Sequence, residues 1–142
     1  MIEVRPLLPQ ELATLEVQPW QRKPEFALTP DYCEFICAHS VMPTGMWLDG
    51  ALVAAGGAVE IWAERAEVWM LLAEASGRDF LGVHRVARRF LDAMPYDRLE
   101  TTCELGWPQA KRWLEMLGFA HECLARKYMP GGRDVDIYVR IK

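Results

Sequence analysis

The chain has 142 residues, a formal net charge of -4, 51% hydrophobic residues and 25% charged residues. This length suits one compact core and is short for two ordinary domains, so we expect a single domain over residues 1–142. The composition is too apolar for a disordered chain, and no apolar run reaches membrane-spanning length. The acidic balance disfavours nucleic-acid binding, because phosphate neutralisation needs clustered Lys and Arg.

Residues 1–6 lack the basic start, apolar stretch and cleavage site of a secretory signal, which predicts a cytoplasmic protein. The irregular spacing of Cys33, Cys37, Cys103 and Cys123 favours free, mostly buried thiols over a disulfide framework. Cys33 and Cys37 have helical spacing on an apolar face, so we expect no metal there.

The N-terminal third predicts one strand and two helices. A strand is expected over residues 2–7 and a helix over 9–17. After a proline-containing loop, Thr29-Pro30-Asp31 has the pattern of an N-cap, a first-turn proline and a first-turn acid. This pattern predicts a second helix that continues to about His39.

The middle of the chain predicts a hairpin. Asp49-Gly50 separates apolar runs over residues 45–48 and 51–62, and this dipeptide is the strongest short-range hairpin signal. Gly56-Gly57 in the second strand indicates a bulge or a close backbone approach. The remaining elements, in chain order, are a strand over 66–73, a helix over 78–94, a strand over 99–103, a helix from 108 to the stop at Gly118, and strands over 119–129 and 135–142.

This order of elements predicts an α/β (α+β) domain. It is also the order of the Gcn5-related N-acetyltransferase superfamily, and residues 110–119, which end in Gly118-Phe119, resemble the late helix of that superfamily. Within it, the segment from Val68 to the C-terminus is most similar to small tailed-phage proteins of the internal virion protein A type. The resemblance implies an acetyltransferase-like fold with a mixed, mostly antiparallel central sheet of about six or seven strands flanked by helices.

The resemblance further implies an acyl-CoA cleft beside the fourth strand, with acetyl-CoA as cofactor and an amine as acceptor. The pantetheine arm would pair with the strand backbone at Leu71, Leu72 and Ala73. The pyrophosphate would lie at the N-terminus of the next helix, where loop N–H groups and the positive helix end favour a phosphate. The loop residues that the resemblance assigns to it are Ser76, Gly77, Arg78 and Gly82.

The catalytic candidates are two carboxylates near the fourth strand, Glu67 and Glu74, because an amine must lose a proton before it attacks a thioester. A solvated strand-end carboxylate is the alternative interpretation of each. The sequence departs from the family at Leu114, where many members have a tyrosine that acts as general acid, and at His84, where the family has a glycine or alanine.

Two functions remain open. The first is a phage-encoded protein that transfers an acetyl group from acetyl-CoA to an amine in the host cytoplasm. The second is a catalytically inactive scaffold or binding module that contacts a virion or host protein and is associated with the virion or with that host partner. Aromatic residues are favoured at interface centres, so a protein-binding surface is expected from Trp20, Trp47, Trp62 and Trp107.

Overall fold

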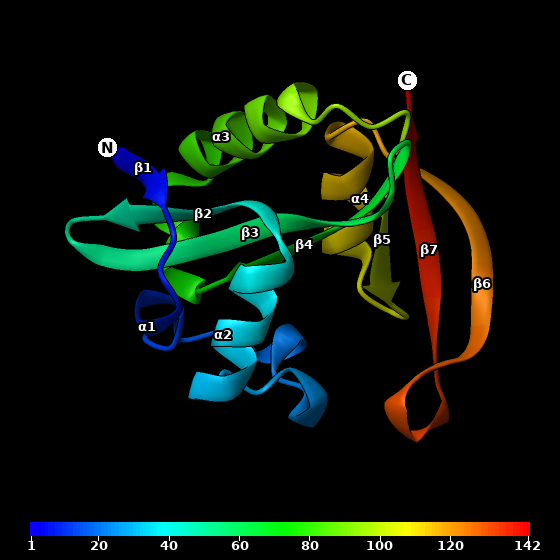
Figure 1. Cartoon of the computed structure of the whole chain (residues 1–142), viewed down its shortest axis with the longest axis horizontal. Helices are drawn as coiled ribbons and strands as arrows, with labels where there is room; N and C mark the ends of the chain where they lie inside the picture. Colours follow the sequence, from blue (N-terminus) through cyan, green and yellow to red (C-terminus); the bar gives the residue numbers. More distant parts are fainter. The chain divides into compact units, whose positions relative to one another are not determined.

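The computed structural model describes all 142 residues, and Figure 1 shows their helices and strands. The chain divides into two compact units, residues 1–60 with 68–94 and residues 61–67 with 95–142. The strands are β1 (Ile2–Pro6), β2 (Val41–Leu48), β3 (Ala51–Trp62), β4 (Arg65–Leu72), β5 (Arg98–Glu104), β6 (Ala120–Met129) and β7 (Arg133–Ile141). The helices are α1 (Pro9–Leu12), α2 (Pro30–His39), α3 (Phe80–Ala93) and α4 (Pro108–Met116).

The strands form one seven-stranded sheet in the order β1-β2-β3-β4-β5-β7-β6. Strands β4 and β5 are parallel, whereas β1 with β2, β2 with β3, β5 with β7 and β6 with β7 are antiparallel. The prediction of a mixed, mostly antiparallel sheet flanked by helices is confirmed. None of the helices combines the length and the apolar character that a bilayer span requires.

The predicted hairpin joins β2 and β3. Asp49 and Gly50 both have positive φ angles, 51° and 82°, which is the backbone that a tight two-residue turn between antiparallel strands requires. The predicted close approach at Gly56 is also present, since a Cβ atom there would lie 2.9 Å from the carbonyl oxygen of Trp69. Glycine at this position therefore lets β3 and β4 lie close together.

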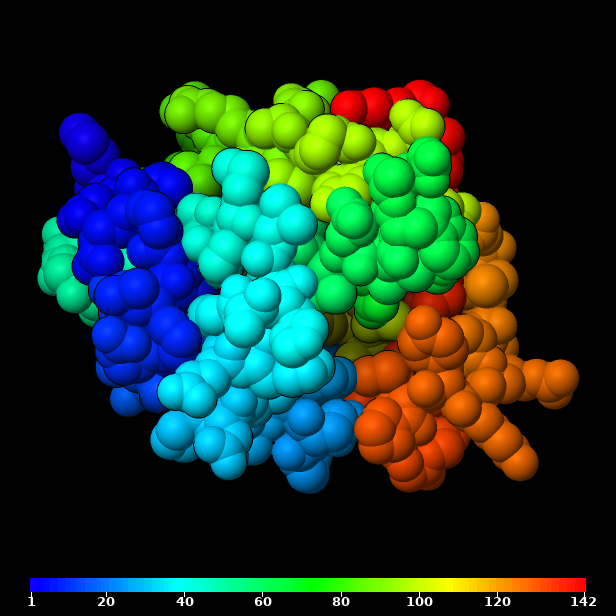
Figure 2. Space-filling model, viewed as in Figure 1, coloured from blue at the N-terminus to red at the C-terminus, as the bar shows by residue number.

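The core of the first unit forms where β1, α1, α2 and the hairpin meet. Its buried side chains are Leu7, Leu12, Leu15, Cys33, Trp47, Leu52, Ala55 and Ala73. The prediction that Trp47 lies on the surface is wrong: the residue is 5% exposed, and the guanidinium of Arg5 lies 3.6 Å from the ring centroid. Figure 2 shows the blue N-terminal residues beside the cyan residues of α2 on the surface of this unit.

Helix α1 is much shorter than the predicted helix over 9–17. It ends at Leu12, and Leu12 and Leu15 both turn into the core. Val17 then forms an isolated antiparallel bridge with Ala73. Tertiary pairing has overridden the local helical pattern, and it brings the residues that follow Val17 to the end of β4.

The second unit combines β5, β7 and β6 with α4. The residues of β7 alternate between apolar side chains such as Val135 and Ile137 and polar ones such as Asp136 and Tyr138, and this alternation alone would expose the polar face. Instead Asp136 and Tyr138 are also buried, at 6% and 3% exposure. The reason is α4, whose Lys111 ammonium lies 2.9 Å from Asp136 Oδ2, so the second face of β7 is covered as well.

Replacement of Leu12 by alanine tests the core of the first unit. Leu12 is completely buried, so we expect Leu12→Ala to lower the free energy of unfolding by about 2–5 kcal/mol. Urea denaturation measures this as a lower midpoint. The matched control, Leu8→Ala, removes the same atoms from a side chain that is 51% exposed, and its midpoint stays near that of the wild type. Equal losses in the two variants would contradict this account of the core.

Candidate functional site

Strand β4 and the residues that directly follow it carry the pantetheine and carboxylate candidates of the sequence. Leu72 and Ala73 are buried at its end, and Leu71 is half-buried. Glu67 lies in its first half and is half-buried, whereas Glu74 follows the strand and is exposed. The two carboxylate candidates therefore have different surroundings.

One edge of β4 is shared between a neighbouring strand and a loop. The carbonyl of Glu64, just before β4, accepts from the backbone N–H of Arg98, and the β4–β5 ladder has three residue pairs that end at Glu67 and Glu100. Backbone groups alternate between the two edges of a strand, so Met70 and Leu72 present theirs on the same edge as Glu64. Buried backbone groups require partners.

Those partners come from the loop after α1. The Nε2 of Gln21 donates to the Met70 carbonyl at 2.7 Å, and the Leu72 N–H donates to Oε1 of Gln21 at 2.8 Å. The Leu72 carbonyl accepts from the backbone N–H of Gln18 at 2.8 Å. Both backbone groups of Leu72 are thus bonded within the chain.

We call residues 17–22 the strap. Its last part is a short 3-10 turn, Pro19–Gln21, in which the Gln21 N–H donates to the Gln18 carbonyl at 2.9 Å. The Gln18 side chain donates to Oε1 of Gln21 at 3.1 Å, and Nε of Arg22 donates to the Val17 carbonyl at 2.7 Å. These bonds hold the Gln21 carboxamide in one orientation against β4.

The loop assigned to a phosphate is a 3-10 helix, Glu74–Asp79, that leads into α3. Ser76 is buried, and its N–H donates to the Ala73 carbonyl at 3.0 Å. Gly77 is exposed, and Arg78 is an exposed side chain whose guanidinium lies 3.8 Å from the Asp49 carboxylate. The structure therefore places Arg78 in solvent.

The N-terminus of α3 is capped by a carboxylate. Asp79 is the N-cap residue, and its Oδ1 accepts from the N–H of Gly82 at 3.0 Å. A Cβ atom at Gly82 would lie only 2.5 Å from Oδ2 of Asp79, so glycine makes room for this carboxylate. The positive end of the α3 dipole is thus already paired with a negative charge.

A separate group of charges lies in the second unit, on β4, β5 and β6. Arg65 and Arg98 both bond to Glu100, the latter through Nε at 2.8 Å, and Arg98 also forms a two-pronged pair with Glu122. The pKa of the Glu100 carboxyl is lowered, chiefly by the hydrogen bond from Arg65. Burial opposes this, but the hydrogen bonds from Arg65 and Arg98 together outweigh it.

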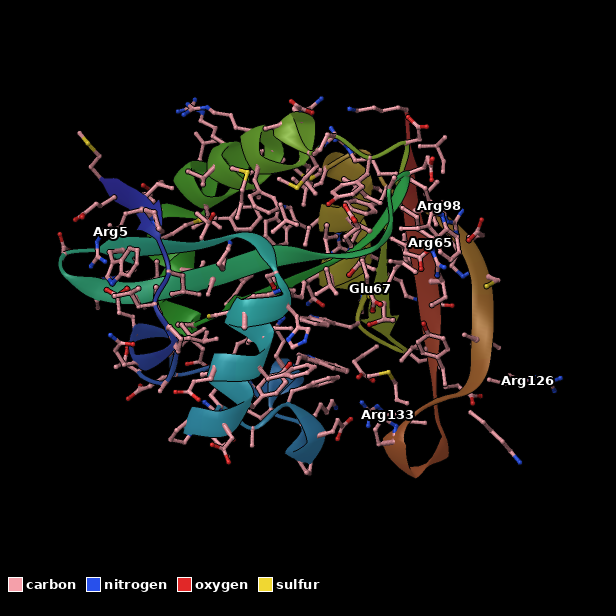
Figure 3. The ribbon with its side chains drawn as sticks, in the orientation of Figure 1. Arg5, Arg65, Glu67, Arg98, Arg126 and Arg133 are labelled. Atoms are coloured by element: carbon pink, nitrogen blue, oxygen red, sulfur yellow. The ribbon has the colours of Figure 1, made fainter.

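Glu67 stands beside this group without an ion pair of its own. Burial, together with the negative charge of Glu100, raises the pKa of its carboxyl, and the charge of Arg65 only partly opposes this. The pKa of the Tyr128 phenol is raised by burial and then by the charges of Glu67 and Glu100. Figure 3 shows Glu67 and Arg65 on β4 and Arg98 on β5. A half-buried carboxyl with a raised pKa is a typical candidate for a base.

The other polar cluster of the second unit involves α4. Asp136 accepts from Lys111 at 2.9 Å and lies 2.8 Å from Nε2 of His121. Burial opposes ionisation of Asp136, but the bonds from Lys111 and His121 prevail and lower its pKa. Burial raises the pKa of Cys103 to about 11, so this thiol is protonated near neutral pH. The cluster fastens α4 to the sheet and offers no thiolate nucleophile.

The strand order, with helices on a mixed sheet, defines the fold of the GNAT-family acetyltransferases. Solved structures with this fold include Ard1 from Thermoplasma volcanium (TM-score 0.82, 12% identity, 99% of this chain and 97% of that chain). They also include an acetyltransferase from Bacillus anthracis (TM-score 0.74, 14% identity, 99% of this chain and 94% of that chain). A third is the ribosomal-protein-S18-alanine N-acetyltransferase from Escherichia coli (TM-score 0.72, 17% identity, 99% of this chain and 94% of that chain). At these identities the likeness establishes the fold. No family model and no curated protein sequence matches the chain.

The positions that the resemblance assigned to acetyl-CoA do not accommodate it in this arrangement. Leu72 would pair with the pantetheine arm, but Gln18 and Gln21 already bond to its backbone. The pyrophosphate would meet the N-terminus of α3, but the Asp79 carboxylate is there. A second negative charge at this helix end would be repelled rather than attracted.

Sequence reasoning missed Gln18, Gln21, Asp79 and Glu100. Asp79 was accessible, because Asp is a preferred N-cap residue and it stands three residues before an N–H that it caps. Gln21 had no local signal, since its partner Leu72 is 51 positions away. The importance of Glu100 depends on the strand register that places it beside Glu67.

The raised pKa of Glu67 predicts a pH-dependent stability. Ionisation of Glu67 is easier in the unfolded chain, so this residue costs no stability below its unfolded pKa of about 4.3 and becomes costly as the pH rises through its folded pKa. We therefore expect Glu67→Gln to unfold at a higher urea concentration than the wild type at pH 7. The difference should disappear near pH 4. Glu74→Gln, at an exposed position, is the control and should leave the midpoint unchanged at both pH values; a destabilised Glu67→Gln at pH 7 would refute the assignment.

Proposed function

We propose that the chain is an N-acetyltransferase that modifies a cationic amine, with acetyl-CoA as the acyl donor and Glu67 as the base. The observation that carries the proposal is the half-buried Glu67 carboxyl on β4, which has a raised pKa and no ion pair. The fold supports the reaction class, since solved structures that share it are described as N-acetyltransferases.

The charge arrangement supports a cationic acceptor. Two arginines, Arg65 and Arg98, face three carboxylates, and Glu100 and Glu122 take all of the arginine pairing. When Glu67 is ionised, its negative charge has no ion pair and attracts an ammonium group. A carboxylate with a raised pKa then removes a proton from the ammonium near neutral pH more effectively than an ordinary glutamate, and this leaves the nitrogen lone pair free.

A second candidate function rests on different observations. Leu114 stands where a phenol is common in the family, and the strap and Asp79 occupy the positions assigned to acetyl-CoA. These features support a non-catalytic binding module that contacts a virion or host protein. Trp62, which is 55% exposed and has the Arg65 guanidinium 4.8 Å from its ring centroid, is a candidate contact residue for such a partner.

An acetylation assay distinguishes the two functions. With acetyl-CoA and a panel of polyamines and lysine peptides, we expect the wild type to release CoA and to become faster as the pH rises through the raised pKa of Glu67. Glu67→Gln should lose about 100-fold in rate, in the range that a positioned base contributes, and should lose this pH dependence.

Glu74→Gln is the matched control, because it makes the same chemical change at an exposed position just after β4. It should keep the wild-type rate and pH profile. Equal rates in Glu67→Gln and the wild type would eliminate Glu67 as the base. Capture of one virion or host protein by a chain that transfers no acetyl group would favour the second function.

A further inference from the structure

We infer that the chain carries its own substitutes for two parts of the acyl donor, the Gln21 carboxamide for a pantetheine amide and the Asp79 carboxylate for the pyrophosphate. Both must be displaced before the donor binds. The inference rests on the proposed function, because it concerns how access to the same site is regulated.

The Gln21 carboxamide has the chemistry of a pantetheine amide. It accepts one hydrogen bond from the Leu72 N–H and donates one to the Met70 carbonyl, at 2.8 and 2.7 Å. An amide of a bound arm would use the same two types of bond to a strand edge. Because each backbone group is directed at a complementary atom, only one orientation of the Gln21 amide satisfies both. The edge thus recognises an amide and is already occupied by one.

The Asp79 carboxylate shares its negative charge and its hydrogen-bond acceptors with the pyrophosphate of the donor. Helix N-termini bind phosphates through free N–H groups and the helix dipole. In α3 one of those N–H groups, that of Gly82, bonds to Oδ1 of Asp79 at 3.0 Å. The donor would have to replace this carboxylate, and as long as the carboxylate stays nearby it would also have to overcome the repulsion between two anions.

The strap is held by its own bonds rather than by Gln21 alone. The bridge between Val17 and Ala73 places it beside β4, and Val17 packs against the core of the first unit. Pro19 begins the turn that presents Gln21, and a proline there limits the unfolded alternatives of the loop. The segment is therefore preorganised to close the β4 edge.

Titration calorimetry with acetyl-CoA tests the inference on four proteins: the wild type, Gln21→Ala, Asp79→Asn and the double variant. Asn is a good N-cap, so Asp79→Asn removes the charge and keeps the cap. We expect the double variant to bind at least tenfold more tightly than the wild type, equivalent to about 1.4 kcal/mol. Gln109→Ala, at an exposed position on α4, is the matched control and should bind like the wild type.

Amide hydrogen exchange of Leu72 gives a readout that needs no ligand. The Leu72 N–H should be protected in the wild type and should exchange at least tenfold faster in Gln21→Ala, while the core amide of Val53 stays protected in both. An unprotected Leu72 in the wild type would overturn the inference, because the strap would then be open in solution.

The outcomes separate this inference from the proposed function. If the wild type binds acetyl-CoA as tightly as the double variant does, the inference is overturned and the proposed function stands. If no variant binds and Leu72 is nevertheless protected by Gln21, the proposed function fails and displacement by the donor fails with it. Tighter binding in each single variant, and tighter still in the double variant, supports both, whereas a single variant that binds like the wild type overturns the inference for its residue.

Discussion

The hydrogen-bonding capacity of one edge of β4 is the constraint on which the rest of the structure depends. Where a strand continues beyond its pairing with a neighbour, its N–H and C=O groups need other partners, because burying them unpaired is costly. In this chain the partners are a backbone N–H from Gln18 and a side-chain amide from Gln21. The short α1 and the position of the strap follow from this requirement, since a helix over 9–17 would keep the loop away from β4.

Much of the fold was predictable because its signals are local. The Asp49-Gly50 turn, the Thr29 cap of α2 and the helix expected over 78–94 depend on neighbouring residues, and the structure confirms each of them, the last as α3. Trp47 and α1 were predicted wrongly for the opposite reason. Their environments are set by Arg5, by the core and by Ala73, which are contacts across the fold.

The candidate site was predicted less completely than the fold. The sequence named Glu67 and Glu74 together, and only the register of β4 with β5 distinguishes them by placing Glu67 opposite Glu100. The same register explains the unequal roles of the acids, because Arg65 and Arg98 neutralise Glu100 and leave Glu67 to bear the cost of burial. That cost is a reason to expect a use for Glu67, since functional groups are often kept at the expense of stability.

The contact between Gly82 and Asp79 has an evolutionary consequence. A side chain at position 82 would collide with the carboxylate at 79, so position 82 is restricted to glycine as long as Asp79 keeps the cap. Related chains that keep Asp at 79 should therefore also keep Gly at 82, whereas chains that have lost this acid are free to vary at 82. The first group would retain the closed helix end and the second would have an anion site open to a ligand, so this pair of positions classifies relatives without any assay.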